Sequence, residues 1–255
     1  MISLRNVRAG YAPGEDVLRG ISLDVESGGC LSVIGPNGCG KTTLLRVMAG
    51  ILPFSGEILL DGESVREIKP KAMAKKAAML SQITQVYFSY TVFDTVMMGR
   101  YAHGGGFLSG PGAADREAAE AALESAGVSA DLRGRGIDAL SGGQLQRVFL
   151  AKIFAQDPEV ILLDEPTNHL DLSCQIDLIN FLREWAGQRN KTVVGVLHDI
   201  NLAMMFSDKI MLMDKGEVTA FGACAEVLKS PALNRAYGMD IPGFMLERLR
   251  KWEGF

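Results

Sequence analysis

The chain has 255 residues, of which 47% are hydrophobic and 22% charged, and its net charge is -4. This length and composition are typical of one large folded domain with its own hydrophobic core. Acidic and basic residues are interspersed and no basic block is present, which argues against nucleic acid as a partner. The apolar runs are shorter than the roughly 18 to 20 residues of a membrane span, so we expect any membrane role to act through a partner.

The four cysteines show no metal-ligand spacing; they are Cys30, Cys39, Cys174 and Cys224. We expect reduced thiols in a cytoplasmic protein. At least three of them are predicted to be buried as small hydrophobic side chains.

The first third of the chain is predicted to be rich in strands. Apolar patterns predict strands over 2–7, 18–25 and 30–34, and a glycine-rich turn then leads into a helix over 41–49. Short strands are expected near 56–60 and 78–80.

The middle of the chain has a different character. Residues 113–126 are strong helix formers, 144–155 form an amphipathic helical pattern, and no strand is predicted within 86–156. Strand and helix patterns then alternate again, over 160–163, 172–188 and 192–197. Strands separated by helices indicate a mostly parallel sheet, and the helical stretch is predicted to be an inserted subdomain. The glycine-rich segment 104–112 is expected to be a surface connection.

The most specific motif is a complete G-x-x-x-x-G-K-[ST] match, formed by Gly35, Pro36, Asn37, Gly38, Cys39, Gly40, Lys41 and Thr42. It follows a predicted strand and opens a predicted helix, which an ordinary glycine-rich turn need not do. Its backbone N–H groups can converge on phosphate oxygens. Lys41 supplies positive charge at the β- and γ-phosphates, the Thr42 hydroxyl suits magnesium, and we count the adjacent Thr43 among the nucleotide-binding residues.

Two adjacent carboxylates, Asp164 and Glu165, end the apolar strand 160–163. In a sheet that carries a phosphate loop, this strand end lies beside the phosphates. Asp164 then suits a magnesium contact, and Glu165 can orient and deprotonate the attacking water. The alternative is a pair of solvated acidic residues at a strand end, which the phosphate loop disfavours.

A third motif, Leu140-Ser-Gly-Gly-Gln144, stands directly before the amphipathic helix. Ser141 and Gln144 fit a capping box, and this structural explanation remains open. Gly142 and Gly143 add bare N–H groups at a helix N-terminus, which is a second anion site. One nucleotide in one simple domain does not need two such sites.

Together, in this order and spacing, the three motifs resemble the nucleotide-binding domain of ABC ATPases over roughly residues 1–230. The resemblance implies a P-loop NTPase (RecA-like) α/β core with an N-terminal antiparallel β subdomain and an inserted α-helical subdomain. We expect a single domain, with a catalytic core over 1–85 and 157–230. The helical subdomain would span 86–156, followed by an extension over 231–255.

The resemblance also implies a head-to-tail homodimer that holds two ATP molecules with Mg²⁺. The signature residues Ser141, Gly142, Gly143 and Gln144 of one subunit would face the phosphate loop of the other. Tyr11 resembles the aromatic residue that stacks on adenine, and Gln82 the glutamine that senses magnesium and water. The segment from Asn168 to Asp171 resembles the loop that crosses the dimer interface, with Asp171 near the nucleotide, and His198 resembles the histidine that contacts the γ-phosphate. An ordinary structural role is the alternative for Tyr11 and His198, and the functional role is favoured for both.

Residues 91–101 are similar to importers of ferric siderophores, haem and cobalamin, with molybdate importers also close. The resemblance therefore implies integral membrane permease subunits as partners, an indirect link to a substrate-binding protein, and a place at the cytoplasmic face of the membrane. Val86, Tyr87, Phe88 and Tyr90 could line a permease-docking groove or belong to the subdomain core. The alternative functions are import of molybdate or tungstate and a soluble ABC ATPase that is not coupled to transport. An ABC exporter is a nearer alternative than the soluble ATPase.

Overall fold

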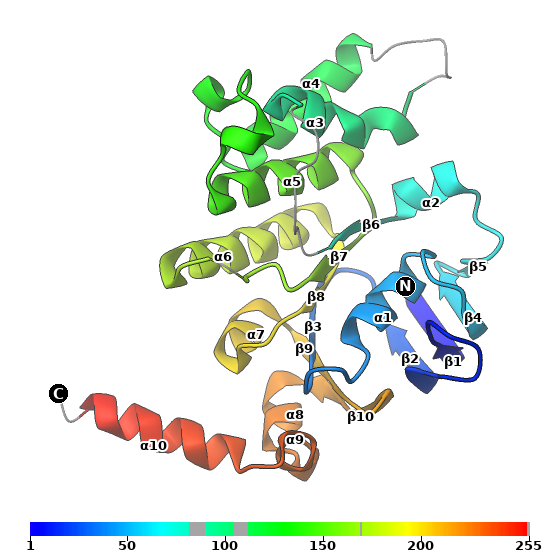
Figure 1. Cartoon of the computed structure of the whole chain (residues 1–255), viewed down its shortest axis with the longest axis vertical. Coiled ribbons are helices and arrows are strands. Elements are labelled where there is room, and N and C mark those ends of the chain that lie inside the picture. Colours follow the sequence, from blue (N-terminus) through cyan, green and yellow to red (C-terminus); the bar gives the residue numbers. More distant parts are fainter. Residues whose placement is uncertain (82–89, 105–111, 169, 254–255) are drawn as a thin grey trace.

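The computed structural model describes residues 1–81, 90–104, 112–168 and 170–253. It contains two β-sheets with helices around them (Figure 1). The predicted α/β architecture, with an antiparallel β part and a mostly parallel core sheet, is confirmed.

The smaller sheet is antiparallel and has the strand order β2-β1-β4-β5. Its strands are β1 (Ile2–Ala9), β2 (Leu18–Val25), β4 (Ser55–Leu60) and β5 (Glu63–Ser64). Ile2 pairs with Val25 on one side and Leu60 on the other, so β1 is one of the two inner strands. Its apolar residues face inward, as expected for a sheet with one covered face.

The core sheet has six strands in the order β10-β9-β3-β8-β7-β6. They are β3 (Gly29–Ile34), β6 (Ala77–Leu80), β7 (Val160–Asp164), β8 (Thr192–Val196), β9 (Lys209–Asp214) and β10 (Glu217–Ala223). Every residue of β7 and β8 is buried, because helices or the other sheet cover both faces of these parallel strands. Among the described strands of this sheet, β10 alone runs antiparallel, in a hairpin with β9.

Two hydrophobic clusters lie on opposite faces of the core sheet. One packs helix α1 (Lys41–Met48) and the antiparallel sheet against the core strands. The other contains α5 (Gly142–Gln156), α6 (Leu172–Arg189) and α7 (Ile200–Phe206). The phosphate loop therefore emerges at the edge of a sheet that is packed on both sides, which gives it a rigid base.

The helical region lies at one end of the molecule, at the top of Figure 1. In its described residues it has no strand, as predicted, and contains α3 (Val92–Met97), α4 (Ala113–Ser125), α5 and short 3-10 helices at Met98–Ala102, Ala130–Leu132 and Ile137–Ala139. Gly99 lets two of these helices meet closely, because a Cβ there would lie 2.2 Å from the Lys152 carbonyl oxygen. Helix α2 (Pro70–Lys76) precedes β6 and was not predicted.

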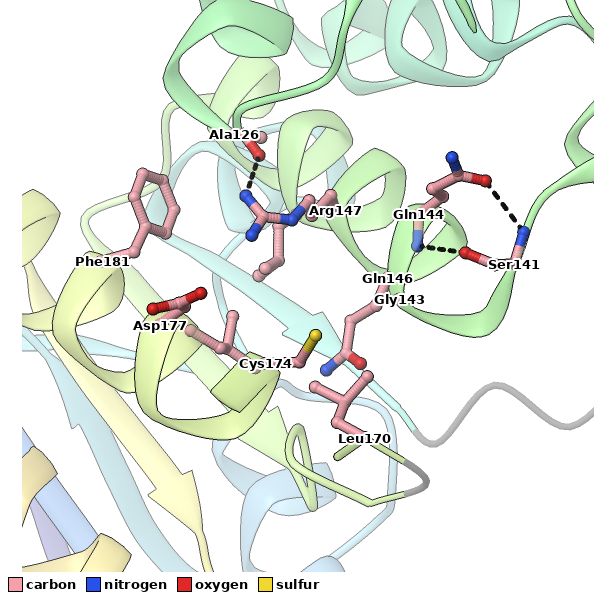
Figure 2. Close-up of a pocket in the computed structure, with 12 residues that line it drawn as sticks. Ala126, Ser141, Gly143, Gln144, Gln146, Arg147, Leu170, Cys174, Asp177 and Phe181 are labelled. Atoms are coloured by element: carbon pink, nitrogen blue, oxygen red, sulfur yellow. Dashed lines mark hydrogen bonds between the residues drawn. The ribbon is translucent and has the colours of Figure 1, made fainter. Parts of the chain in front are cut away.

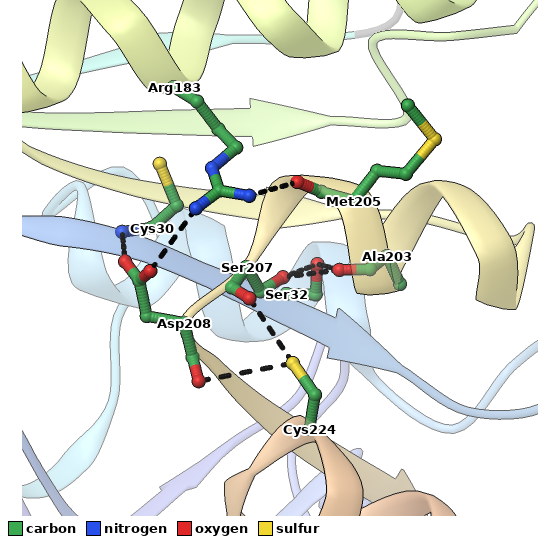
Figure 3. A network of polar contacts seen from close by, with 8 residues as sticks. All are labelled: Cys30, Ser32, Arg183, Ala203, Met205, Ser207, Asp208 and Cys224. Carbon is green, nitrogen blue, oxygen red and sulfur yellow. Dashed lines mark hydrogen bonds and ion pairs between the residues drawn. The ribbon is translucent and has the colours of Figure 1, made fainter.

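A polar network connects helices α6 and α7 to the N-terminal end of β3 (Figure 3). Asp208 accepts a hydrogen bond from Cys30 N (2.9 Å) and pairs with Arg183 of α6, and Arg183 also donates to the Met205 carbonyl of α7 (2.7 Å). Burial raises the pKa of the Cys30 thiol to about 12, so this thiol stays protonated. The prediction that at least three cysteines are buried is wrong: Cys30 and Cys39 are buried, whereas Cys174 and Cys224 lie nearer the surface, in helix first turns.

The last described residues form three helices, α8 (Cys224–Lys229), α9 (Pro231–Tyr237) and α10 (Ile241–Glu253). Figure 1 shows α10 reaching away from the body of the molecule. Among the helices of the described residues, none combines the length and apolarity that crossing a membrane requires.

Candidate nucleotide-binding site

The phosphate loop joins β3 to α1, as its motif predicts. Gly38 and Gly40 have φ angles of +77° and +104°, which L-residues rarely adopt, so these glycines permit the tight turn. The loop borders a cleft of about 810 Å³. Its lining brings together residues from both halves of the sequence: Tyr11, Val17, Asn37, Gly38, Gly40, Lys41, Thr42, Thr43, Glu165, Asn168 and His198.

Lys41 is buried within this loop, although it carries a charge. Its Nζ donates to the carbonyl oxygens of Gly35 (2.8 Å) and Pro36 (2.9 Å), which compensates the buried ammonium group. Cys39 is buried beside it, and burial raises the pKa of this thiol. The loop therefore holds a positive charge at the cleft and carries no thiolate.

Thr42, which lines the cleft, is in contact with the buried Asp164. The Thr42 hydroxyl donates to Asp164 Oδ1 at 2.9 Å, across 122 positions of sequence. Burial raises the pKa of the Asp164 carboxyl, and the Thr42 hydrogen bond offsets part of that shift. Among the described residues no group of three or more His, Cys, Asp or Glu side chains could hold a metal alone. Magnesium usually needs only one or two protein oxygens beside substrate phosphates and water, so a hydroxyl and a carboxylate in contact fit it.

Glu165 follows Asp164 and has two partners. His198 Nε2 lies 2.5 Å from Glu165 Oε1, and Asn168 Nδ2 donates to Glu165 Oε2. The φ of Glu165 is +54°, a conformation that costs a non-glycine residue about 1–2 kcal/mol. The turn thus directs this carboxylate into the cleft between a histidine and an amide. The contact with Asn168 was not predicted, since a spacing of three residues does not by itself reveal it.

Tyr11 lies at the mouth of the same cleft. Its hydroxyl is 3.3 Å from Thr43 Oγ1 and accepts a hydrogen bond from Arg46 Nη1 at 3.0 Å. The Arg46 guanidinium lies 5.8 Å from the centre of the ring, and 58% of Tyr11 is exposed. An aromatic ring anchored to α1 and open on its other side can serve as a stacking platform. Sequence reasoning missed Arg46, although it lies on the helix that follows the loop.

The signature residues occupy the start of α5 and do not line the phosphate cleft. Ser141 Oγ accepts a hydrogen bond from Gln144 N (3.4 Å), and Gln144 Oε1 accepts one from Ser141 N (3.0 Å), so the capping box is confirmed. Gly142 and Gly143 form the first turn of the helix. A second cavity of about 210 Å³ lies next to them, between α5 and α6 (Figure 2).

One further predicted position, Asp171, lies away from the phosphate cleft. Asp171 caps the N-terminus of α6, where Oδ1 accepts from Cys174 N at 2.8 Å, and this hydrogen bond lowers the pKa of Asp171. It does not line the phosphate cleft. Gln82 lies outside the described residues, as do His169 and the proposed docking residues Val86, Tyr87 and Phe88; Tyr90 is exposed.

Comparison with known proteins adds independent findings. Residues 18–168 match the family model described as ABC transporter. The petrobactin import ATP-binding protein YclP of Bacillus subtilis (strain 168) is 36% identical over 243 residues, which cover 95% of this chain and 94% of that protein. The ferric enterobactin transport ATP-binding protein FepC of Escherichia coli (strain K12) is 35% identical, over 88% of this chain and 82% of that protein.

A solved structure is similar over most of the chain. The dimeric ATP-binding cassette MJ0796, in a post-hydrolysis state bound to ADP and Pi, superposes with a TM-score of 0.77 and 27% sequence identity. The match covers 88% of this chain and 99% of that chain.

Proposed function

Since this chain belongs to the ABC transporter family and is an ATPase coupled to transport, we propose that it powers an importer of a ferric siderophore, haem or cobalamin. The support for import lies in relatives named for petrobactin import and ferric enterobactin transport, which are similar over nearly the whole chain. The motif of segment 91–101 resembles this importer group. The segment begins at Thr91, which caps α3, and contains α3 and most of the 3-10 helix that follows.

The observation that carries the hydrolysis mechanism is the position of Glu165. Its carboxylate lies at the phosphate cleft, with one oxygen at His198 and the other at Asn168. A carboxylate held in one orientation can take a proton from a water molecule that attacks the γ-phosphate. The His198 side chain is 38% exposed, lies close enough to this carboxylate to keep it oriented, and faces the same cleft.

The phosphate groups of ATP would lie over the loop that surrounds Lys41. The backbone N–H groups and the Lys41 ammonium group stabilise negative charge on the transferring phosphate. A magnesium ion bound with ATP would be held by Thr42 and Asp164, with Gln82 as a further proposed ligand, and would neutralise phosphate charge. Tyr11 would stack on adenine, and Arg46 supports its ring from α1.

A homodimer accounts for the separation of the two anion-binding motifs. Within one chain the phosphate cleft and the signature start of α5 have different linings. In a head-to-tail dimer, Ser141, Gly142, Gly143 and Gln144 of one subunit would complete the site of the other, near Asp171. The similar MJ0796 cassette is dimeric, which supports this arrangement.

The transport partners follow from the same proposal. Two copies would bind integral membrane permease subunits through the helical region and lie at the cytoplasmic face of the membrane. A substrate-binding protein would be linked only indirectly, through the permease. Closure of the dimer on ATP would move the helical regions and the permease segments docked on them.

Affinity purification of the tagged chain from native membranes in mild detergent tests the partner assignment. We expect a multi-span membrane protein to copurify, with identification by mass spectrometry. Uptake assays with ferric siderophore, haem, cobalamin and molybdate, in cells with and without the gene, then test the substrate. Recovery of soluble partners alone would contradict the transporter assignment, and uptake of molybdate alone would contradict the proposed substrate class.

A further inference from the structure

Helix α9 is packed next to the phosphate loop. In α9, Ala232 and Leu233 are buried in the cluster on one face of the core sheet, and Tyr237 packs partly buried against it. Gly238, with a φ of +68°, then ends this helix in the left-handed conformation. The last residue of α9 is therefore held at a defined place beside the core, although it follows the loop by some 200 positions.

The Tyr237 side chain contacts the first residue of the phosphate loop. Gly35 N donates a hydrogen bond to Tyr237 Oη at 3.1 Å. Burial raises the pKa of this phenol, so the hydroxyl is neutral and can accept the bond. The donor belongs to a buried backbone group, for which an unmade hydrogen bond is costly.

Gly35 has no room for a side chain. Its φ is +147°, and a Cβ at this position would lie 2.1 Å from the Met213 carbonyl oxygen and 3.0 Å from Cys39 Sγ. Its own carbonyl oxygen accepts the hydrogen bond from Lys41 Nζ at 2.8 Å. One residue thus connects the tyrosine, through its N–H, to the loop lysine, through its carbonyl.

We propose that Tyr237 is a positioning residue for ATP binding. Its hydroxyl holds Gly35, the first residue of the phosphate loop, and thereby the carbonyl oxygen that accepts the hydrogen bond from Lys41 Nζ. The inference rests on the proposed assignment of the phosphate loop. It gives the C-terminal segment a role in the nucleotide site, although Tyr237 itself need not touch the nucleotide. The side chain acts from outside the loop, through its hydroxyl oxygen.

The test is Tyr237→Phe in the full-length chain, since phenylalanine keeps the ring and removes only the hydroxyl. The loss of one hydrogen bond to the loop should raise the dissociation constant and the KM for ATP by roughly three- to tenfold, with kcat changed by less than about twofold. Tyr101→Phe is the matched control, because 78% of Tyr101 is exposed and it does not line the phosphate cleft, and it should leave both constants unchanged. The melting temperature without nucleotide is measured for each variant.

A role in packing alone would lower the melting temperature of Tyr237→Phe without changing its KM, and this result overturns the inference. An unchanged KM with an unchanged melting temperature overturns it as well. Lys41→Ala, measured in parallel, separates the two proposals. If that variant binds ATP as the wild type does, the loop assignment fails; if it loses binding while Tyr237→Phe does not, only the role of Tyr237 fails.

Discussion

Substitution of Glu165 by glutamine separates the chemistry of hydrolysis from the binding of ATP. Glutamine has nearly the same shape as glutamate, and both of its terminal atoms can be satisfied in this site. Its carbonyl oxygen can accept from Asn168 Nδ2, and its amide can donate to His198 Nε2 in the tautomer that leaves this nitrogen free. We therefore expect the site to keep its geometry.

The variant loses only the group that can accept a proton from water. A positioned general base contributes about 10²- to 10⁴-fold to a rate, which corresponds to about 3–5.5 kcal/mol of the barrier. We expect kcat to fall by that factor, whereas the dissociation constant for ATP should change by less than about threefold. Because ATP then persists in the site, the ATP-bound dimer should accumulate.

Phosphate release under single-turnover conditions measures the rate, and size-exclusion chromatography with ATP measures the dimer. Glu57→Gln is a matched control: it makes the same chemical change at an exposed position of β4 and should hydrolyse ATP at the wild-type rate. Wild-type hydrolysis by Glu165→Gln would refute the assignment of the base. A large loss of ATP binding would refute the argument that glutamine fits the site.

Three further predictions concern side chains of the candidate nucleotide site. Lys41→Ala removes the positive charge that the carbonyl groups of Gly35 and Pro36 hold in the loop. The dissociation constant for ATP, measured by calorimetry, should rise by about tenfold or more, and an affinity equal to that of the wild type would argue against the loop assignment. Tyr11→Ala removes a stacking surface of about 1–3 kcal/mol, so affinity should fall by roughly 5- to 150-fold, whereas a change confined to kcat would count against stacking. Burial raises the pKa of Asp164. Between the unfolded and folded pKa values of this group, the folded chain therefore binds more protons than the unfolded chain, and the free energy of unfolding falls as pH rises. At neutral pH Asp164→Asn should therefore raise the Tm of the nucleotide-free protein while hydrolysis is lost; a lower Tm would contradict this reasoning.

Most parts of the site that sequence reasoning found are contiguous motifs with a local conformation, whereas Tyr11 and His198 were found through the family resemblance. The phosphate loop depends on glycines at fixed offsets, and the capping box of α5 depends on Ser141 and Gln144 alone. Strands β7 and β8 were recognised because both faces of each strand are apolar. In these places local preference and the tertiary fold agree.

Apart from the local contact of Asn168 with Glu165, the contacts that were missed join distant segments. Neither Arg46 beside Tyr11 nor Tyr237 beside Gly35 follows from spacing, because the packing of the sheets brings them together. Some missed elements did carry local signals: Pro70 opens α2, and Thr91 caps α3 by accepting a hydrogen bond from Asp94 N. The hairpin of β9 and β10 turns at Lys215 and Gly216, both with positive φ.

The capping box at Ser141 affects how the proposed dimer would assemble. A hydroxyl group has two lone pairs and one proton, and the cap uses a lone pair to accept from Gln144 N. The proton remains available to an anion that binds at the N-terminal end of the helix, so the donor is preorganised before the second subunit arrives. The first turn of α5 would not have to unfold when the dimer forms. Loss of Ser141 would remove the cap and the donor together, so an inactive variant becomes interpretable only when its folding stability is measured as well.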